Sequence, residues 1–199
     1  INHDRYRKIA VEDARPVLER FGISKPFFVY IGRLELKKNV ELILRAFMQA
    51  RPNAELILAG PPGFGHEELL KLAETSEIAS AIHFVGYITE DEKVALLSSA
   101  AALIHPTWYE GFGITIVEAM ACHCPVLCSD TASLPEVAGR AHAQWFNPAN
   151  VPALATEMER ALEPDSTRTA RLASAFEWSR QYTWEQTATH TLRALTDWS

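Results

Sequence analysis

Short apolar runs recur along the chain, and most of them end at or beside a glycine, proline or aspartate. Continuous apolar runs of this length are typical of strands that are buried on both faces of a parallel sheet. The runs cover residues 26–32, 54–60, 82–87, 101–106, 125–130 and, more weakly, 143–148. The pattern therefore predicts about six strands.

Segments with helical periodicity separate these strands. Residues 39–50 place apolar side chains at i, i+3, i+4 and i+7, which makes one stripe, and Asn39 is the expected N-cap. The segment 89–100 begins with Thr89 and carries Glu92 three positions later, which is a capping-box pattern. Further helices are expected over residues 114–122 and around 154–162.

This alternation predicts the α/β class: a Rossmann-like, doubly wound parallel sheet with helices on both faces. Ligands of such sheets bind at the carboxyl ends of the strands. Unusual residues in the loops that follow the strands are therefore the candidates for a functional site.

The two ends of the chain have a different pattern. Residues 1–12 are polar and basic and show no clear apolar stripe. Pro16 argues against one long helix from residue 3, so a short helix over residues 13–21 is expected. Residues 166–199 predict two more helices, separated near Tyr182 to Trp184.

Composition narrows the class of protein. The 199 residues suffice for one domain with a sizeable core, and 48% hydrophobic with 22% charged residues is typical of a soluble globular protein. A net charge of −6 argues against nucleic acid as a partner, because phosphate backbones require a concentrated basic surface. No signal peptide or membrane-spanning run is expected, and the start at Ile1 suggests a piece of a longer protein.

Three cysteines, Cys122, Cys124 and Cys128, crowd one short stretch. An odd count does not suggest a disulfide framework, and Cys122 and Cys124 are too close in sequence for the usual zinc-knuckle spacing. We therefore interpret them as small apolar packing residues in a reducing compartment.

The loop after the first predicted strand is basic. Gly32 closes the strand, and Arg33 and Lys38 follow in the segment GRLELKKN. A planar guanidinium and a compact ammonium at the carboxyl edge of the sheet can clamp a diphosphate, and the next helix can add its dipole. A solvated basic turn is the alternative interpretation.

The loop after the fourth predicted strand carries two acids, in the segment HPTWYEGFGITIVEA. Glu110 should lie at the carboxyl edge, Gly111 and Gly113 let backbone N–H groups approach a ligand, and Glu118 lies about one turn into the next helix. Ionised carboxylates accept hydrogen bonds from sugar hydroxyls, so one acid could hold a hexose and the other a ribose. A glycosidase-like acid pair, a metal site and ordinary surface charge are the alternatives.

Two further features are ambiguous. His105 ends the fourth predicted strand, where a lone histidine is most simply structural. The hydroxyl side chains and Glu136 in residues 129–139 either face the same cleft or cap the next short helix.

Together these segments are more specific than any one of them alone. GRLELKKN, LAGPP, FVGYIT and HPTWYEGFGITIVEAMACHCPVLCSDTASLPEVAG occur in the order and spacing of one family. The chain resembles the C-terminal domain of retaining GT-B glycosyltransferases of group 1, often called GT4, over residues from about 25 to 165. Its best-known signature is the pair of glutamates with seven residues between them, here Glu110 and Glu118.

The resemblance implies a role for each matching position. Arg33 and Lys38 would hold the donor diphosphate, Glu110 the transferred sugar and Glu118 the ribose hydroxyls. It assigns the catalytic role to Arg33, Lys38 and Glu110. The donor-binding residues that it implies are Gly32, Arg33, Lys38, Tyr87, Ile88, Glu110, Gly111, Phe112, Gly113, Ile114 and Glu118.

Some positions depart from the family pattern. His123 stands where glycine is usual, at an expected helix end that favours positive φ. Thr115, Arg140 and the extra proline in GPPGFG (residues 60–65) also differ. None of them removes a group expected to bind the donor, so they bear on specificity rather than on class.

The resemblance also implies an activity and a domain organisation. The expected reaction is transfer of a hexose such as mannose, with retention, from GDP-mannose or a UDP-hexose to a glycan or lipid-linked acceptor, with no metal or other cofactor. Residues 1–24 would lead in from a missing N-terminal acceptor domain, 25–182 bind the donor, and 183–199 cross back to that domain. Trp184 and Trp198 are then expected to be exposed.

The setting that the resemblance favours is bacterial cell-surface polysaccharide synthesis, in the cytoplasm or peripherally at the inner face of the membrane. Two other functions stay open. One is a non-catalytic module that binds a nucleotide-sugar, and the other is a GT-B sugar-nucleotide epimerase.

Overall fold

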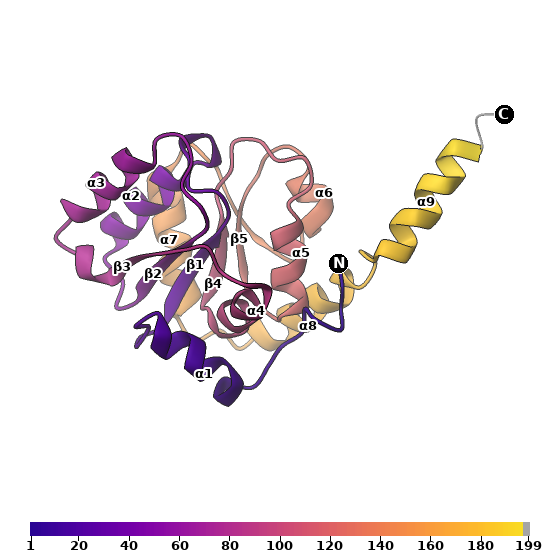
Figure 1. The fold of residues 1–199 in the computed structure, drawn as a ribbon, viewed down its shortest axis with the longest axis horizontal. Helices are drawn as coiled ribbons and strands as arrows, with labels where there is room; N and C mark the ends of the chain where they lie inside the picture. The colour runs from indigo at the N-terminus through magenta and orange to yellow at the C-terminus, as the bar shows by residue number, and fades with distance from the viewer. Residues whose placement is uncertain (197–199) are drawn as a thin grey trace.

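All six predicted strands are present in the computed structural model, which describes residues 1–196 (Figure 1). Each strand lies inside the apolar run that predicted it, and four of the six are buried along all or nearly all of their length, as expected for a sheet that is covered on both faces. The strands are β1 Phe27–Ile31, β2 Glu55–Ala59, β3 Ile82–Gly86, β4 Ala102–His105, β5 Val126–Ser129 and β6 Gln144–Phe146.

Helices cover both faces of this sheet. Alternate side chains of β1 point to opposite faces: Phe28 and Tyr30 pack with α2, α3 and α7, whereas Phe27 and Val29 pack with α4, α5, α6 and α8. The helical elements are α1 Val11–Arg20, η1 Leu36–Lys38, α2 Val40–Ala50, α3 His66–Glu74, η2 Ala79–Ala81, α4 Glu90–Ser99, α5 Ile114–Ala121, α6 Leu134–Ala138, α7 Val151–Leu162, α8 Arg168–Ser179 and α9 Trp184–Thr196.

The strand order identifies where a ligand should bind. The strands pair in parallel in the order β3-β2-β1-β4-β5-β6. The chain therefore winds outward from β1 to β3 and then returns to place β4 on the other side of β1. Open α/β sheets bind ligands at this switch point, beyond the carboxyl ends of the two central strands. Here those strands are β1 and β4, so the loops that follow them border the site.

One of the remaining helices was predicted and another was missed. The short helix expected over residues 13–21 is α1 Val11–Arg20, and residues 3–10 are not helical. Pro16 lies inside α1, where it costs one backbone hydrogen bond without ending the helix. Helix α3 was not predicted; it buries a short stripe of Leu69 and Ala73.

Several local predictions are confirmed. Thr89 and Glu92 form the complete capping box at the start of α4. His123 follows α5 with a φ of 55°, in the left-handed region. The three cysteines are free and buried.

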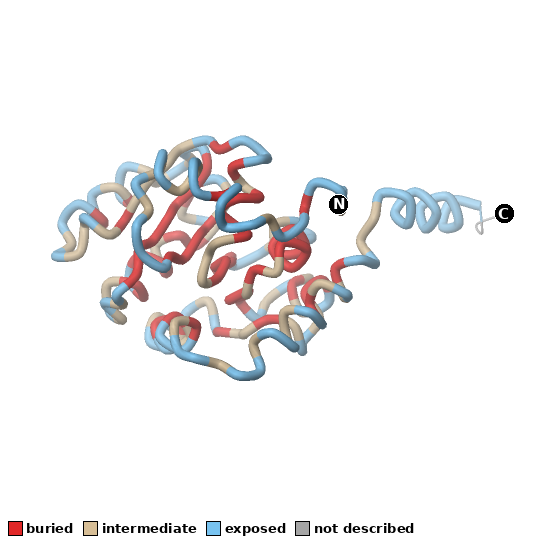
Figure 2. Tube along the Cα trace, turned by 90° about the horizontal axis from the view of Figure 1, so that it is seen from below, coloured by how far each residue is buried: buried red, intermediate tan, exposed pale blue. Residues whose placement is uncertain are grey.

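The C-terminal helix stands apart from the rest of the molecule. Figures 1 and 2 show α9 projecting from the body of the protein, and none of its residues is buried. Trp184, at its start, is 63% exposed, as expected, whereas Trp198 lies outside the described residues. Within residues 1–196, no helix has the length and apolar character needed to cross a membrane.

Candidate functional site

The loop after β1 is held in place by the loop after β2. The buried Leu34 donates its backbone N–H to the carbonyl of Pro61 at 2.9 Å and accepts from the N–H of Gly63 at 3.0 Å. The hydroxyl of Tyr30 donates to the carbonyl of Arg33 at 3.0 Å. These contacts fix the backbone that carries Arg33 and Lys38, although the loop has little regular structure of its own.

Asn39 does not act as the predicted helix cap. It stands at the N-cap position of α2 with a φ of 59°, and its side chain makes no hydrogen bond to the helix. Instead its Nδ2 donates to the carbonyls of Pro106 and Pro148, each at 2.9 Å. The side chain therefore ties the β1 loop to the β4 loop across the switch point.

Hydroxyl groups at the end of β5 and in the loop that follows it support the loop after β4. Residues 129–139 were expected either to face the cleft or to cap the next helix. The hydroxyls among residues 129–133 instead donate to backbone carbonyls, and Ser133, at the N-cap position of α6, makes no capping bond. The three bonds run from Ser129 Oγ to the Thr107 carbonyl at 2.8 Å, from Thr131 Oγ1 to the Trp108 carbonyl at 3.1 Å and from Ser133 Oγ to the Glu110 carbonyl at 3.0 Å. The backbone of the Glu110 loop is thus fixed on one side.

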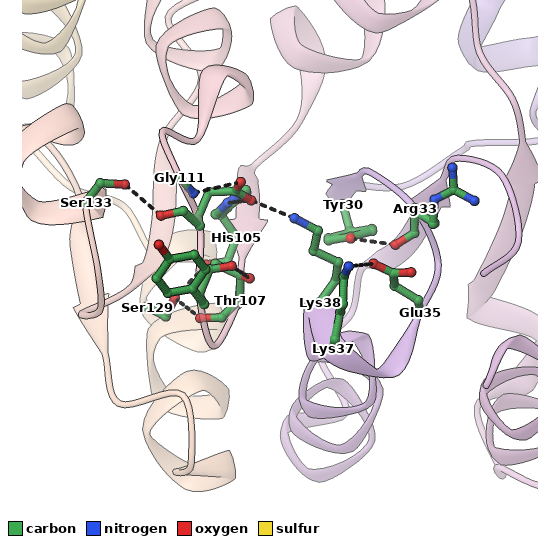
Figure 3. A network of polar contacts seen from close by, with 12 residues as sticks. Tyr30, Arg33, Glu35, Lys37, Lys38, His105, Thr107, Gly111, Ser129 and Ser133 are labelled. Atoms are coloured by element: carbon green, nitrogen blue, oxygen red, sulfur yellow. Dashed lines mark hydrogen bonds and ion pairs between the residues drawn. The ribbon is translucent and has the colours of Figure 1, made fainter. Parts of the chain in front are cut away.

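The two loops meet through an ion pair. Lys38 Nζ lies 2.9 Å from Glu110 Oε2, and Nε2 of the buried His105 lies 3.6 Å from the same oxygen. Figure 3 shows Lys38 reaching from the β1 loop toward His105 and the β4 loop. Arg33 is exposed, and its guanidinium points away from that pair. Of the three predicted catalytic residues, two are therefore in contact and Arg33 lies apart from them.

The surroundings of Glu110 keep its carboxyl ionised. Its contact with His105 and the ion pair with Lys38 lower its pKa to about 2, although partial burial acts in the opposite direction. Among residues 1–196, no group of three or more His, Cys, Asp and Glu side chains is arranged to hold a metal ion. The site therefore presents the ionised carboxylate of Glu110 beside the amine of Lys38, at the carboxyl ends of the parallel strands.

The second glutamate lies deeper in the fold. Glu118 projects from α5 and is 5% exposed, and its two oxygens lie 3.2 Å and 3.4 Å from Lys93 Nζ on α4. Helix α5 begins after Gly113, which has a φ of 85°; a Cβ there would come within 2.8 Å of Leu134. A side chain at this position would be strained by the positive φ and would also require the side chain of Leu134 to shift.

Comparison of the sequence with models of protein families identifies the family of this chain. Residues 18–177 match the family model described as glycosyl transferases, group 1. The chain belongs to the group 1 glycosyl transferase family. Its sheet and helices are those of the C-terminal half of the GT-B fold.

Individual members of the family are similar over most of the chain. The O-antigen chain mannosyltransferase B of Escherichia coli is 34% identical over 90% of the chain, and the serotype-specific mannosyltransferase WbdA of the same organism is 29% identical over 90%. The chain spans 48% of the first of these relatives and 23% of the second. It therefore corresponds to half or less of their length.

Solved structures share the fold. HepE from Anabaena, in complex with UDP and glucose, is similar with a TM-score of 0.87 and 22% identity, over 98% of this chain and 55% of HepE. The sucrose-phosphate synthase of Thermosynechococcus elongatus gives 0.86 and 23%, over 100% of this chain and 52% of the synthase. At these identities the likeness concerns the fold.

The remaining predicted residues of this group 1 chain lie in the loops after β1, β3 and β4 and at the start of α5, in different environments. Tyr87 is 77% exposed, whereas the side chain of Ile88 is buried in the core. Phe112 and Ile114 are exposed, and the ring of Phe112 meets that of Tyr182 edge to face, 5.5 Å between centroids. Gly32 directly follows β1, and Gly111 lies in the loop between β4 and α5.

Sequence reasoning missed Lys93 and Tyr6 and interpreted His105 as merely structural. One signal was available for the cation: Glu118 is the single charged residue in the otherwise apolar helix α5, and a buried acid requires a partner. Nothing in the sequence showed that the partner would come from α4. No pattern indicated that the N-terminal segment would bring Tyr6 to the same place.

Proposed function

We propose that this group 1 chain is the donor-binding half of a retaining hexosyltransferase. Its donor would be GDP-mannose or a UDP-hexose, and its acceptor a glycan or lipid-linked saccharide in bacterial cell-surface polysaccharide synthesis. The observation that carries the proposal is the contact of Lys38 with Glu110 at 2.9 Å, at the point where ligands of this fold bind.

The chemistry of that pair suits a nucleotide-sugar. A carboxylate with a pKa of about 2 is an acceptor for sugar hydroxyls at any physiological pH. The ammonium of Lys38 can leave Glu110 for a more highly charged diphosphate, with the exposed guanidinium of Arg33 as a second donor. The names of the two Escherichia coli relatives favour mannose, and the HepE complexes favour a nucleoside diphosphate.

In the proposed reaction the acceptor oxygen bonds to the anomeric carbon on the face from which the diphosphate departs. The bond between the anomeric carbon and the diphosphate oxygen breaks, and the acceptor's proton passes to the departing diphosphate. Arg33 and Lys38 stabilise the charge that grows on this leaving group, and Glu110 holds the sugar. Removing one such donor typically lowers kcat about 100- to 1000-fold.

The test is calorimetric titration of the chain with UDP, GDP, ADP and NAD, repeated with Lys38→Met and Glu118→Ala. We expect one nucleoside diphosphate to bind and both substitutions to weaken it. Lys37→Met is the matched control, because Lys37 is the neighbouring lysine, is exposed and contacts Glu35 rather than Glu110. Binding of none of the four ligands, or equal losses for Lys37→Met and Lys38→Met, would refute the donor site.

A further inference from the structure

Lys93 has more polar partners than an ordinary surface lysine. Its side chain is only 15% exposed, and its amine contacts Glu118, Glu90 Oε1 at 3.2 Å and the hydroxyl of Tyr6 at 2.8 Å. An ammonium has three N–H donors, so three partners use all of them and hold the amine in one position. The same amine lies 5.2 Å from the centroid of the Tyr6 ring, which shields it from water.

Tyr6 is a buried residue in a mostly exposed segment. Its hydroxyl donates to Glu90 while it accepts from Lys93, and burial, with the acids Glu90 and Glu118 nearby, raises its pKa, so it remains neutral. The segment is fastened on both sides of it: the backbone nitrogen of Ile1 donates to the Tyr182 carbonyl at 2.7 Å, and the Ile9 N–H donates to Ser98 Oγ at 3.2 Å. The amine of Lys93 is therefore held from outside the helix that carries it.

Resting on the donor site proposed above, we propose that Lys93 is a positioning residue for the ribose of the donor nucleotide. A carboxylate has about four lone-pair sites. The N–H of Lys93 that faces Glu118 is shared between its two oxygens, at 3.4 Å and 3.2 Å, and on the other side of the carboxylate each oxygen keeps a lone pair for one of two adjacent hydroxyls. The lysine thus fixes the plane of the carboxylate and supplies the countercharge that a buried acid requires.

The geometry distinguishes this role from a simple structural salt bridge. Within residues 1–196 Glu118 forms no other ion pair, and Tyr6, the other polar group that interacts with it, is itself hydrogen-bonded by Lys93, so the orientation of the carboxylate depends on Lys93. The consequence is confined to the ligand group that Glu118 would hold. Loss of Lys93 should impair recognition of the ribose hydroxyls and leave recognition of the base and the diphosphate unchanged.

The test compares UDP and GDP with their 2′,3′-dideoxy analogues on the chain and its variants, by calorimetry. With Lys93→Met we expect the nucleotide that binds the wild type to bind roughly 10- to 100-fold more weakly, as for loss of a hydrogen bond to a charged group. We expect the affinity for its dideoxy analogue to change by less than about twofold, because the analogue lacks the two hydroxyls that Glu118 would bind. The ratio of the two dissociation constants does not depend on how much of the variant is folded.

Other variants complete the design. Lys93→Arg keeps a cation and should restore part of the ratio, and in a Glu118→Gln background Lys93→Met should have little further effect, because it acts through that acid. Arg45→Met is the control, since Arg45 pairs with Glu41 on the exposed face of α2 and should leave the ratio unchanged. Equal weakening of ribose and dideoxy ligands by Lys93→Met would overturn the proposal. A wild-type chain that binds neither nucleotide would overturn the donor site itself and this role with it.

Discussion

At the scale of single residues, opposing effects act on the carboxyl of Glu110. Partial burial disfavours its charge, whereas His105 and Lys38 stabilise it, and the stabilising contacts prevail, so its pKa falls to about 2. A carboxyl with a lowered pKa contributes stability that is complete above its unfolded value, near 4.5, and that disappears as the pH falls through about 2. The pair of Lys38 and Glu110 should therefore persist through all mildly acid conditions.

The first prediction concerns this titration. Lys38→Met removes one of the two groups that lower the pKa, so the carboxyl of Glu110 should titrate closer to its ordinary value of 4.5. Carbon-13 NMR of the glutamate side chains during acid titration measures it, with Glu110→Gln to assign the signal. Lys37→Met should leave the signal where it is in the wild type, and an unchanged pKa in Lys38→Met would contradict the prediction.

The second prediction concerns the cysteines. Burial raises the pKa of Cys122 and Cys124 to about 12 and also raises that of Cys128, so almost no thiolate is present at neutral pH. We expect none of the three to react with Ellman's reagent in the native protein at pH 8, and all three to react in guanidinium chloride. Fast labelling of one native thiol would show that this part of the core opens readily.

At the scale of elements, the β1 and β2 loops approach each other closely enough to require glycine. Gly60 follows β2 with a φ of 141°, and a Cβ there would come within 1.9 Å of the carbonyl oxygen of Gly32 after β1. Backbone cannot move aside as a flexible side chain can. The position of Lys38 on the β1 loop therefore depends on a glycine in a different loop.

The third prediction follows from this contact. Gly60→Ala should lower the free energy of unfolding by at least about 3 kcal/mol, because backbone strain and a clash add to each other. Gly22→Ala is the matched control: Gly22 has a φ of 69° and open space around it, so strain alone should cost about 1 kcal/mol. Urea unfolding measures both, and equal losses in the two variants would mean that the two loops separate easily.

At the scale of the whole molecule, α9 buries none of its residues against the described part of the chain. Its exposed apolar residues include Trp184, Leu192 and Leu195. The proposed crossing of residues 183–199 to an N-terminal domain would cover them, and that division of the chain stays a prediction. The helix before it differs, since α8 packs on α5 and buries Ala175.

The fourth prediction compares two truncations. A chain that ends at Thr183 lacks α9. Its free energy of unfolding, measured in urea, should equal that of the full chain to within about 0.5 kcal/mol, because no buried residue is lost. A chain that ends at Ser166 also lacks α8 and the hydrogen bond from Trp178 to the Val137 carbonyl, and should be clearly less stable. A large loss of stability in the chain that ends at Thr183 would show that α9 packs on the rest of the protein in solution.

The sequence by itself determined the elements and their class. Apolar runs predict the six strands, because burial on both faces leaves few polar positions in them. The capping at Thr89 is a contact between near neighbours, which a local pattern can reveal. The candidate site residues came from the resemblance to group 1 enzymes, because the order and spacing of the motifs identify the loops that follow particular strands. A local signal failed at Asn39, whose side-chain amide binds the carbonyls of Pro106 and Pro148 instead of capping α2.

Only the tertiary structure decided which residues meet. The strand order brings the β1 and β4 loops together, so Lys38 and Glu110, 72 positions apart, form one ion pair. Packing of α4 on α5 gives Glu118 its cation, and the N-terminal segment brings Tyr6 against that cation. Such partners are set by how helices and loops stack on a twisted sheet, which depends on the whole fold and leaves no periodic trace in the chain.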